Sequence, residues 1–115
     1  LDCNYNLYGK SFEQFICMEV RAYLSYSRKK LPLTYWRSKS GHEVNFLIGT
    51  RTAIEVKASR KISKNDFKGL NYLKEEGVFQ NLILVSQDPV SALADSILTV
   101  PWKKFLSDLW KDKFV

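Results

Sequence analysis

The sequence predicts an α/β domain in which a mixed central sheet is flanked by helices. Three observations carry this prediction: apolar strand segments, amphipathic helical segments between them, and the order in which they alternate. The expected order is a helix, three strands, a helix, two strands and a final helix. We expect residues 1–115 to form one domain, because 115 residues is an ordinary size for a single core.

The first element is a helix over residues 11–27, "SFEQFICMEVRAYLSYS". Ser11 and Gln14 have the spacing of a capping box. The segment "RKKLP" ends the helix, because a residue before proline avoids the helical region. Its apolar residues recur at helical spacing and share one face, which we expect to pack on the sheet: Phe12, Phe15, Ile16, Val20, Tyr23 and Leu24.

Three strands are expected next, at residues 33–37, 42–49 and 52–59. Only a short connection separates the second from the third, which predicts an antiparallel hairpin. Residues two apart on a strand share a face. The alternation of the second strand predicts one face with His42, Val44, Phe46 and Ile48, and the opposite face with Glu43, Asn45 and Leu47.

The second half continues with a helix over residues 62–77, "ISKNDFKGLNYLKEEG", which Ser63 caps and Gly77 ends. The run "NLILVSQ" at 81–87 is continuously apolar, as in a strand buried on both faces. A shorter strand is expected at 96–100 and an amphipathic helix at 101–112.

The net charge is +6, and the basic excess lies in the first half of the chain. Residues 1–64 hold 12 Lys and Arg against 5 Asp and Glu, a charge of +7, whereas residues 65–115 hold 6 against 7, a charge of −1. This distribution fits a polyanionic partner, and it fits equally a solubilising surface.

The two cysteines, Cys3 and Cys17, predict neither a disulfide framework nor a zinc site, and Cys17 is expected to be a small core residue. The apolar runs are too short to span a bilayer, and no signal-peptide pattern is present. We therefore expect a cytoplasmic protein. Since the chain begins with Leu1, we expect it to be part of a longer protein.

Polar residues that could bind a metal ion or take part in catalysis lie on the expected hairpin: Glu43, Asn45, Glu55 and Lys57. If its strands pair in register, these side chains converge on one face near the open end. Converging carboxylates repel each other, and a divalent cation relieves that repulsion. Oxygen ligands suit Mg²⁺ or Mn²⁺, and a nearby lysine can orient water or stabilise charge on a phosphate.

The first helix adds two acids to this prediction. Glu13 and Glu19 lie about 60° to either side of Ile16 on its apolar face, so either can approach the same site. The spacing of Glu55 and Lys57 alone also fits a plain surface ion pair.

The segments "GKSFEQF", "YWRSKSGHEVNFLI" and "AIEVKAS" together resemble the PD-(D/E)XK nuclease superfamily. The resemblance is closer to the uncharacterised domain found C-terminal to AAA+ ATPase modules in archaea and bacteria, and it covers about Gly9 to Leu109. It implies a three-layer restriction-endonuclease-like fold. It also implies that the chain is the C-terminal part of an ATPase-linked protein.

The resemblance assigns roles to individual residues. Glu13 matches the acid of the first helix, Glu55 the second metal-binding carboxylate and Lys57 the catalytic lysine. Asn45 stands where the superfamily has its metal-binding aspartate, and the neighbouring Glu43 is a substitute ligand.

The implied function is a nuclease-fold domain that engages DNA phosphates. Its hydrolysis, which would need Mg²⁺ or Mn²⁺, is expected to be weakened or lost through Asn45. The alternative is a non-catalytic domain that docks an AAA+ ATPase module.

Basic residues flank the expected site in sequence and form either a phosphate track or a solvated rim: Arg37, Lys39, Arg51, Arg60, Lys61 and Lys64. The single histidine, His42, is expected to be structural or exposed rather than a catalytic base. The aromatic residues Tyr35, Trp36, Trp102 and Trp110 are expected to pack in the core rather than stack on bases.

Overall fold

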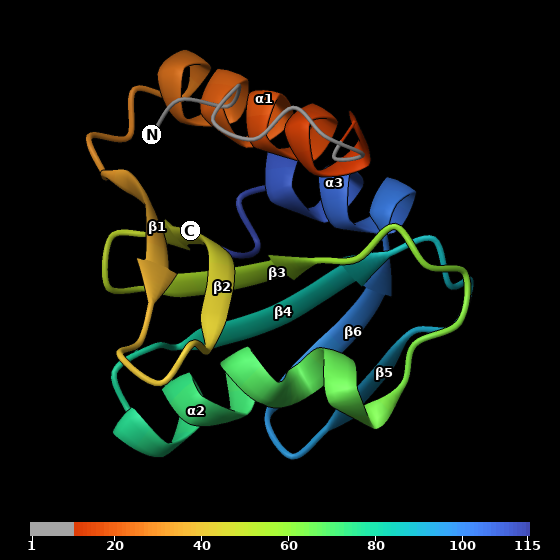
Figure 1. The fold of residues 1–115 in the computed structure, drawn as a ribbon. Helices are drawn as coiled ribbons and strands as arrows, with labels where there is room; N and C mark the ends of the chain where they lie inside the picture. Colours follow the sequence, from red (N-terminus) through yellow and green to blue (C-terminus); the bar gives the residue numbers. More distant parts are fainter. Residues whose placement is uncertain (1–10) are drawn as a thin grey trace.

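A computed structural model describes residues 11–115 and has a mixed six-stranded sheet between two layers of helices (Figure 1). Helices α1 and α3 cover one face of the sheet, and α2 covers the other. The predicted α/β fold with helices on both faces is therefore confirmed. The elements are α1 Ser11–Tyr26, β1 Leu33–Arg37, β2 Glu43–Ile48, β3 Thr52–Val56, a 3-10 turn Lys64–Phe67, α2 Lys68–Glu76, β4 Asn81–Ser86, β5 Ala92–Ala94, β6 Ile97–Pro101 and α3 Trp102–Trp110.

The strand order across the sheet is β1-β2-β3-β4-β6-β5. Strands β3, β4 and β6 are parallel, while β1 and β2 form an antiparallel meander with β3, and β5 is antiparallel to β6. The predicted hairpin of β2 and β3 is confirmed. Helix α2 provides the crossover that a parallel pair such as β3 and β4 requires.

Two apolar cores lie on the two faces of the sheet. The core under α1 and α3 includes Ile16, Val20, Phe46, Ile54, Val85 and Phe105. The core under α2 includes Val44, Leu47, Ala53, Leu70, Leu73 and Leu84. Because β3 and β4 contribute to both cores, the centre of the sheet is buried on both sides and holds the strand ends in place.

A β-bulge in β2 changes the predicted alternation of that strand. Thr34 pairs with Leu47 and Trp36 pairs with Val44. Between these two pairs β1 advances by two residues and β2 by three, so β2 contains one extra residue. Val44 therefore packs in the α2 core, although Phe46 packs in the α1 and α3 core. The prediction that Val44 shares a face with Phe46, and Asn45 with Leu47, is wrong because the extra residue shifts the side-chain period.

Gly69 in α2 lies directly against the strand that carries the bulge. A Cβ atom at this position would come within 2.2 Å of the Glu43 carbonyl oxygen. Only glycine therefore allows α2 to lie this close to the start of β2.

Other departures from prediction are local. The helix predicted over 62–77 is divided into the 3-10 turn and α2, and strand β5 was not predicted. Phe15 is 42% exposed, although its helical spacing placed it on the buried face. No helix among residues 11–115 is long and apolar enough to cross a membrane.

The cysteine predictions have a mixed outcome. Cys17 is buried in the core, as expected. It is also engaged in a disulfide bond, which the count of two cysteines did not indicate, because spacing along a chain does not report distance in space. Cys3 lies outside the described residues.

Candidate functional site

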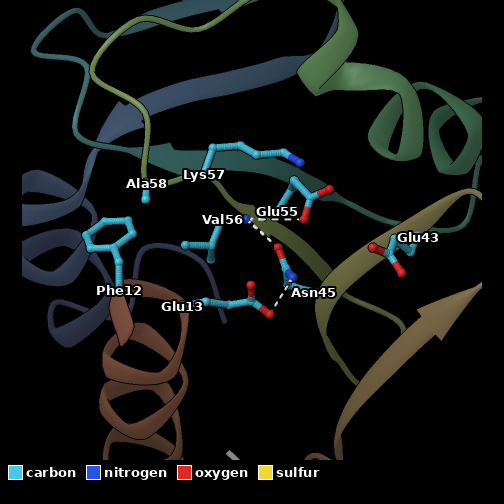
Figure 2. A pocket seen from close by; sticks show the side chains of 8 residues that line it. All are labelled: Phe12, Glu13, Glu43, Asn45, Glu55, Val56, Lys57 and Ala58. Carbon is cyan, nitrogen blue, oxygen red and sulfur yellow. Dashed lines mark hydrogen bonds between the residues drawn. The ribbon is translucent and has the colours of Figure 1, made fainter. Parts of the chain in front are cut away.

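The candidate site lies where β2 and β3 separate, at the carboxyl end of β3. The strands pair from Ile48 with Thr52 as far as Phe46 with Ile54, and the pairing ends there. Helix α1 approaches the gap from one side (Figure 2). A cavity of about 170 Å³ opens at this point and is lined by Phe12, Glu13, Glu43, Asn45, Glu55, Val56, Lys57 and Ala58. Four of the residues predicted from the hairpin, together with Glu13, therefore line one cavity.

Asn45 joins α1 to β3 across this gap. Its Nδ2 donates a hydrogen bond of 2.8 Å to Oε1 of Glu13, and its Oδ1 accepts a hydrogen bond of 2.7 Å from the backbone N–H of Val56. The side chain thus takes the place of the strand pairing that ends at Phe46. Asn45 is 7% exposed, so both ends of its amide are used inside the protein.

Glu55 is the most buried acid of the site, with 5% exposure. Its Oε1 accepts a long hydrogen bond of 3.3 Å from the N–H of Val56, and the carboxylate also accepts a hydrogen bond from the backbone of Asn45. Burial raises the pKa of Glu55 to about 7, although the charge of Lys57 acts in the opposite direction. The carboxyl group is therefore poised between its protonated and ionised forms near neutral pH.

Lys57 follows the last residue of β3 and is partly exposed. Its backbone N–H is held by the Val85 carbonyl oxygen at 2.9 Å, which fixes the start of the side chain. Within residues 11–115 no hydrogen bond or ion pair engages its ammonium group. Figure 2 shows this side chain extending alongside Glu55. The ammonium is thus free to bind an anion.

Glu43 lies on the opposite side of the gap, at the start of β2. The Tyr35 hydroxyl of β1 donates a hydrogen bond to Oε2 of Glu43. Desolvation and this bond to the carboxylate raise the pKa of Tyr35 to about 12, so the phenol keeps its proton. Within residues 11–115 this is the only hydrogen bond of the Glu43 carboxylate, and it engages Oε2.

A second cavity of about 150 Å³ lies on the α2 side of the same gap. Its lining is Gly41, His42, Glu43, Glu55, Lys57, Asn65, Asp66, Lys68 and Gly69. Three residues, Glu43, Glu55 and Lys57, line both cavities. Lys68 is a basic residue that the sequence pattern did not single out, because it lies in a helix far along the chain from the hairpin.

The structure does not bring every predicted residue to the site. Glu19 lies six residues beyond Glu13 on α1, about 9 Å along the helix, and lines neither cavity. Arg51 lies in the turn between β2 and β3, at the other end of β3. Lys64 lines a separate cavity with Phe67 and Asn71.

The remaining basic residues surround the site without lining its cavities. Arg37 lies opposite Glu43 in the backbone register of β1 and β2. Lys39, Arg60 and Lys61 are exposed in the loops after β1 and β3. Their positions are compatible with either alternative drawn from the sequence, a phosphate track or a solvated rim.

The histidine and the aromatic residues divide between packing and surface. The ring of His42 lies tilted against Tyr72, with 5.2 Å between the ring centroids, and the centroid of Trp36 lies 5.5 Å from that of Tyr72. Trp102 meets Phe15 edge-on at 5.6 Å, and Trp110 meets Tyr23 at 5.3 Å. The rings mostly pack against other rings, while Tyr35 is 37% exposed and Trp110 is 41% exposed.

The acids of the site do not form a complete metal cage. Among the described residues, no group of three or more His, Cys, Asp or Glu side chains is placed to hold a metal ion. The site instead offers a buried carboxylate, an exposed carboxylate and a free ammonium on either side of a gap in the sheet. Such a set can bind a phosphate through Lys57 and a hydrogen-bond donor or a cation through the acids.

Residues 8–105 match the model of a protein family described as a domain of unknown function, DUF4143. Neither the curated proteins nor the solved structures contain a match to the chain. The matched range includes all the residues of the candidate site.

Proposed function

Because the chain belongs to the DUF4143 family, whose function is unknown, we propose its function from the site itself: a nuclease-fold domain that binds DNA phosphates and has weakened or lost hydrolysis. The resemblance to the PD-(D/E)XK superfamily supports this proposal. The convergence of Glu13, Asn45, Glu55 and Lys57 on one cavity at the end of a central strand also supports it. Ligands commonly bind beyond the carboxyl ends of parallel strands.

The phosphate would bind at Lys57. Its ammonium is unengaged within the described residues, and its backbone is fixed to β4 through Val85. The exposed Arg60 and Lys61 follow in the same loop and add positive charge beside it. Such contacts to phosphates give affinity that does not depend on base sequence.

The observation that carries the proposed loss of hydrolysis is the hydrogen bonding of Asn45. A metal site of the superfamily type would need carboxylates at positions 13, 45 and 55 to face one hard cation. Here the neutral amide donates to Glu13 and accepts from Val56. The set Glu13, Asn45 and Glu55 therefore does not fit Mg²⁺ or Mn²⁺, because one ligand carries no charge and both ends of its amide are occupied.

The test compares the natural chain with Asn45→Asp in a DNA cleavage assay containing Mg²⁺ or Mn²⁺. We expect no cleavage from the natural chain and measurable cleavage from Asn45→Asp. The double variant Asn45→Asp with Lys57→Ala should lose the gain. DNA binding by the natural chain, measured by fluorescence anisotropy, should weaken steeply as salt rises.

Thermal unfolding provides a check that does not depend on activity. In EDTA, Asn45→Asp should melt below the natural chain, because the new carboxylate faces Glu13 without a hydrogen bond between them. Mg²⁺ should restore part of the difference. If Asn45→Asp cleaves no DNA and its melting temperature does not change on addition of Mg²⁺, the nuclease assignment is refuted. Absence of DNA binding by the natural chain would instead favour the docking role with an AAA+ ATPase module.

A further inference from the structure

We propose that the candidate site takes DNA with an unpaired segment, and that an unpaired base stacks on an aromatic surface beside the cavity. This surface, the aromatic platform, consists of the side chains of Phe12, Phe15 and Trp102. The inference rests on the proposed function and deepens it, because it names the class of DNA that the same site takes. It requires no metal ion and no hydrolysis.

The platform lies at the same edge of the sheet as the candidate site. Strands β3, β4 and β6 are parallel, and Val56, Val85 and Val100 lie side by side near their carboxyl ends. Helix α3 begins at Trp102, directly after β6. Figure 1 shows the first turns of α1 and α3 at this edge. Trp102 therefore lies at the edge of the sheet where the cavity opens.

Phe12 connects the platform to the cavity. It lines the cavity together with Glu13 and Lys57, from the first turn of α1 (Figure 2). Its ring meets the ring of Trp102 edge-on, with 6.4 Å between the centroids and an interplanar angle of 85°. Phe15 meets the same ring in the same way, at 5.6 Å and 84°. The three rings thus form a continuous surface that begins at the cavity.

The platform is open to solvent at Phe15 and Trp102. Phe15 is 42% exposed and Trp102 is partly exposed. The ammonium of Lys103, an exposed residue, lies over the Trp102 ring at 5.4 Å from its centroid. Such a contact is weak at an exposed position. A base can therefore displace the ammonium from the ring, and the ammonium can turn to the adjoining phosphate.

The charges at this edge suit a strand that runs from the cavity to the platform. Lys57 lies at the cavity and Lys103 at the platform, and within the described residues no ion pair engages either ammonium. Glu19 lies one turn of α1 beyond Phe15, about 6 Å along the helix, and its carboxylate would repel a phosphate there. The strand is therefore expected over the first turns of α1 and α3.

A base must be unpaired to reach the platform. Along a duplex each base is covered on both faces by its neighbours, so a protein meets only base edges, sugars and phosphates. Aromatic side chains instead stack on the bases of single strands, with little dependence on sequence. A phosphate-binding lysine beside exposed rings therefore favours DNA in which a duplex continues into a single strand.

Two DNA molecules that differ only in the bases of a tail test the inference. Both have the same duplex and a short single-stranded tail, which carries thymines in one and abasic sites in the other, so the phosphates are equal in number. Fluorescence anisotropy measures the affinity for each, with 5′ and 3′ tails tested separately. We expect the natural chain to bind the thymine tail of at least one polarity about 5- to 150-fold more tightly, as one stacked base provides.

Two alanine variants of α1 form a matched pair. Phe15→Ala and Tyr26→Ala each remove an exposed ring that meets a tryptophan of α3 edge-on, but Tyr26 lies at the far end of α1 from the site. Phe15→Ala should lose most of the preference for the thymine tail, and Tyr26→Ala should keep it. Thermal unfolding checks that both variants remain folded.

Two exposed lysines at opposite ends of α3 provide a second pair. Lys103→Ala should reduce the slope of log affinity against log salt by about 0.7 for the thymine-tailed DNA, and Lys111→Ala should leave it unchanged. Equal affinity for thymine and abasic tails, or a preference that persists in Phe15→Ala, would overturn the inference. An unchanged slope in Lys103→Ala would do the same. Absence of binding to any DNA at low salt would refute the proposed function itself, which distinguishes the two failures.

Discussion

Glu55 makes the stability of the domain depend on pH, because its carboxyl group is buried without a salt bridge within the described residues. Its pKa is raised to about 7 by desolvation, against a value near 4.3 in an unfolded chain. The folded state therefore binds the proton more tightly. The associated stability is fully present below about pH 4.3 and is lost as the pH rises through 7.

We expect this group to lower the free energy of unfolding by roughly 3 kcal/mol between pH 4.5 and pH 8. Urea unfolding in EDTA at several pH values measures the effect. Glu55→Gln cannot ionise, so subtracting its pH profile from that of the natural chain isolates this carboxyl group. Parallel profiles would contradict the prediction.

At the scale of single residues, the sequence located most of the site but not its bonding. The spacing of Glu55 and Lys57 on a strand, and the helical position of Glu13, were sufficient to bring them to one cavity. The contact of Asn45 with Glu13 could not be predicted, because it depends on a bulge in β2. No local residue pattern in the sequence marks that bulge, which shows only in the register of β1 against β2.

At the scale of elements, the contact of α2 with β2 fixes the start of the strand that carries Glu43 and Asn45. Gly69→Ala would place a Cβ atom 2.2 Å from the Glu43 carbonyl oxygen, and this backbone atom cannot rotate away. We expect a loss of roughly 1–3 kcal/mol in unfolding free energy from overpacking. A gain in helix propensity of up to about 1 kcal/mol offsets part of it.

Urea unfolding measures this loss, and Asn71→Ala on the exposed side of α2 is the matched control. That variant should keep or slightly raise the stability, because alanine is the better helix former. Equal stability of Gly69→Ala and the natural chain would show that α2 can move away from β2 at little cost.

The elements with strong patterns were the predictable ones. Strand β1 begins and ends at the predicted residues, and β2, β3 and β4 differ from prediction only at their ends. Strand β5 was missed because its three residues, Ala92–Ala94, are all exposed and show no alternation. The 3-10 turn before α2 was missed because Asp66, whose carboxylate accepts the Ser63 N–H at 2.9 Å, fits an ordinary helix start equally well.

At the scale of the whole molecule, two exposed arginines lie at opposite ends of β3. Comparing them tests which end of the sheet DNA binds. Arg60 follows β3 on the side of the site, whereas Arg51 precedes it at the opposite end. If DNA lies over the site, Arg60→Ala should reduce the slope of log affinity against log salt by about 1. Arg51→Ala should leave the slope unchanged.

Fluorescence anisotropy with one DNA duplex over a series of salt concentrations measures both slopes. The two variants remove the same side chain from exposed positions, so a difference between them reports location rather than net charge. Equal reductions would indicate that DNA binds the basic half of the chain without a fixed orientation.

The hydrogen bond from the Val56 N–H to Asn45 has a practical consequence for nuclear magnetic resonance. Most backbone amide protons within a sheet report on their neighbouring strand, but this one is bound to a side chain in the site. Its resonance therefore senses any event that displaces the Asn45 amide, including movement of α1 through Glu13. A single ¹⁵N-labelled amide at the end of β3 thus provides an internal reporter of ligand entry, readable in the natural chain without a dye or a substitution.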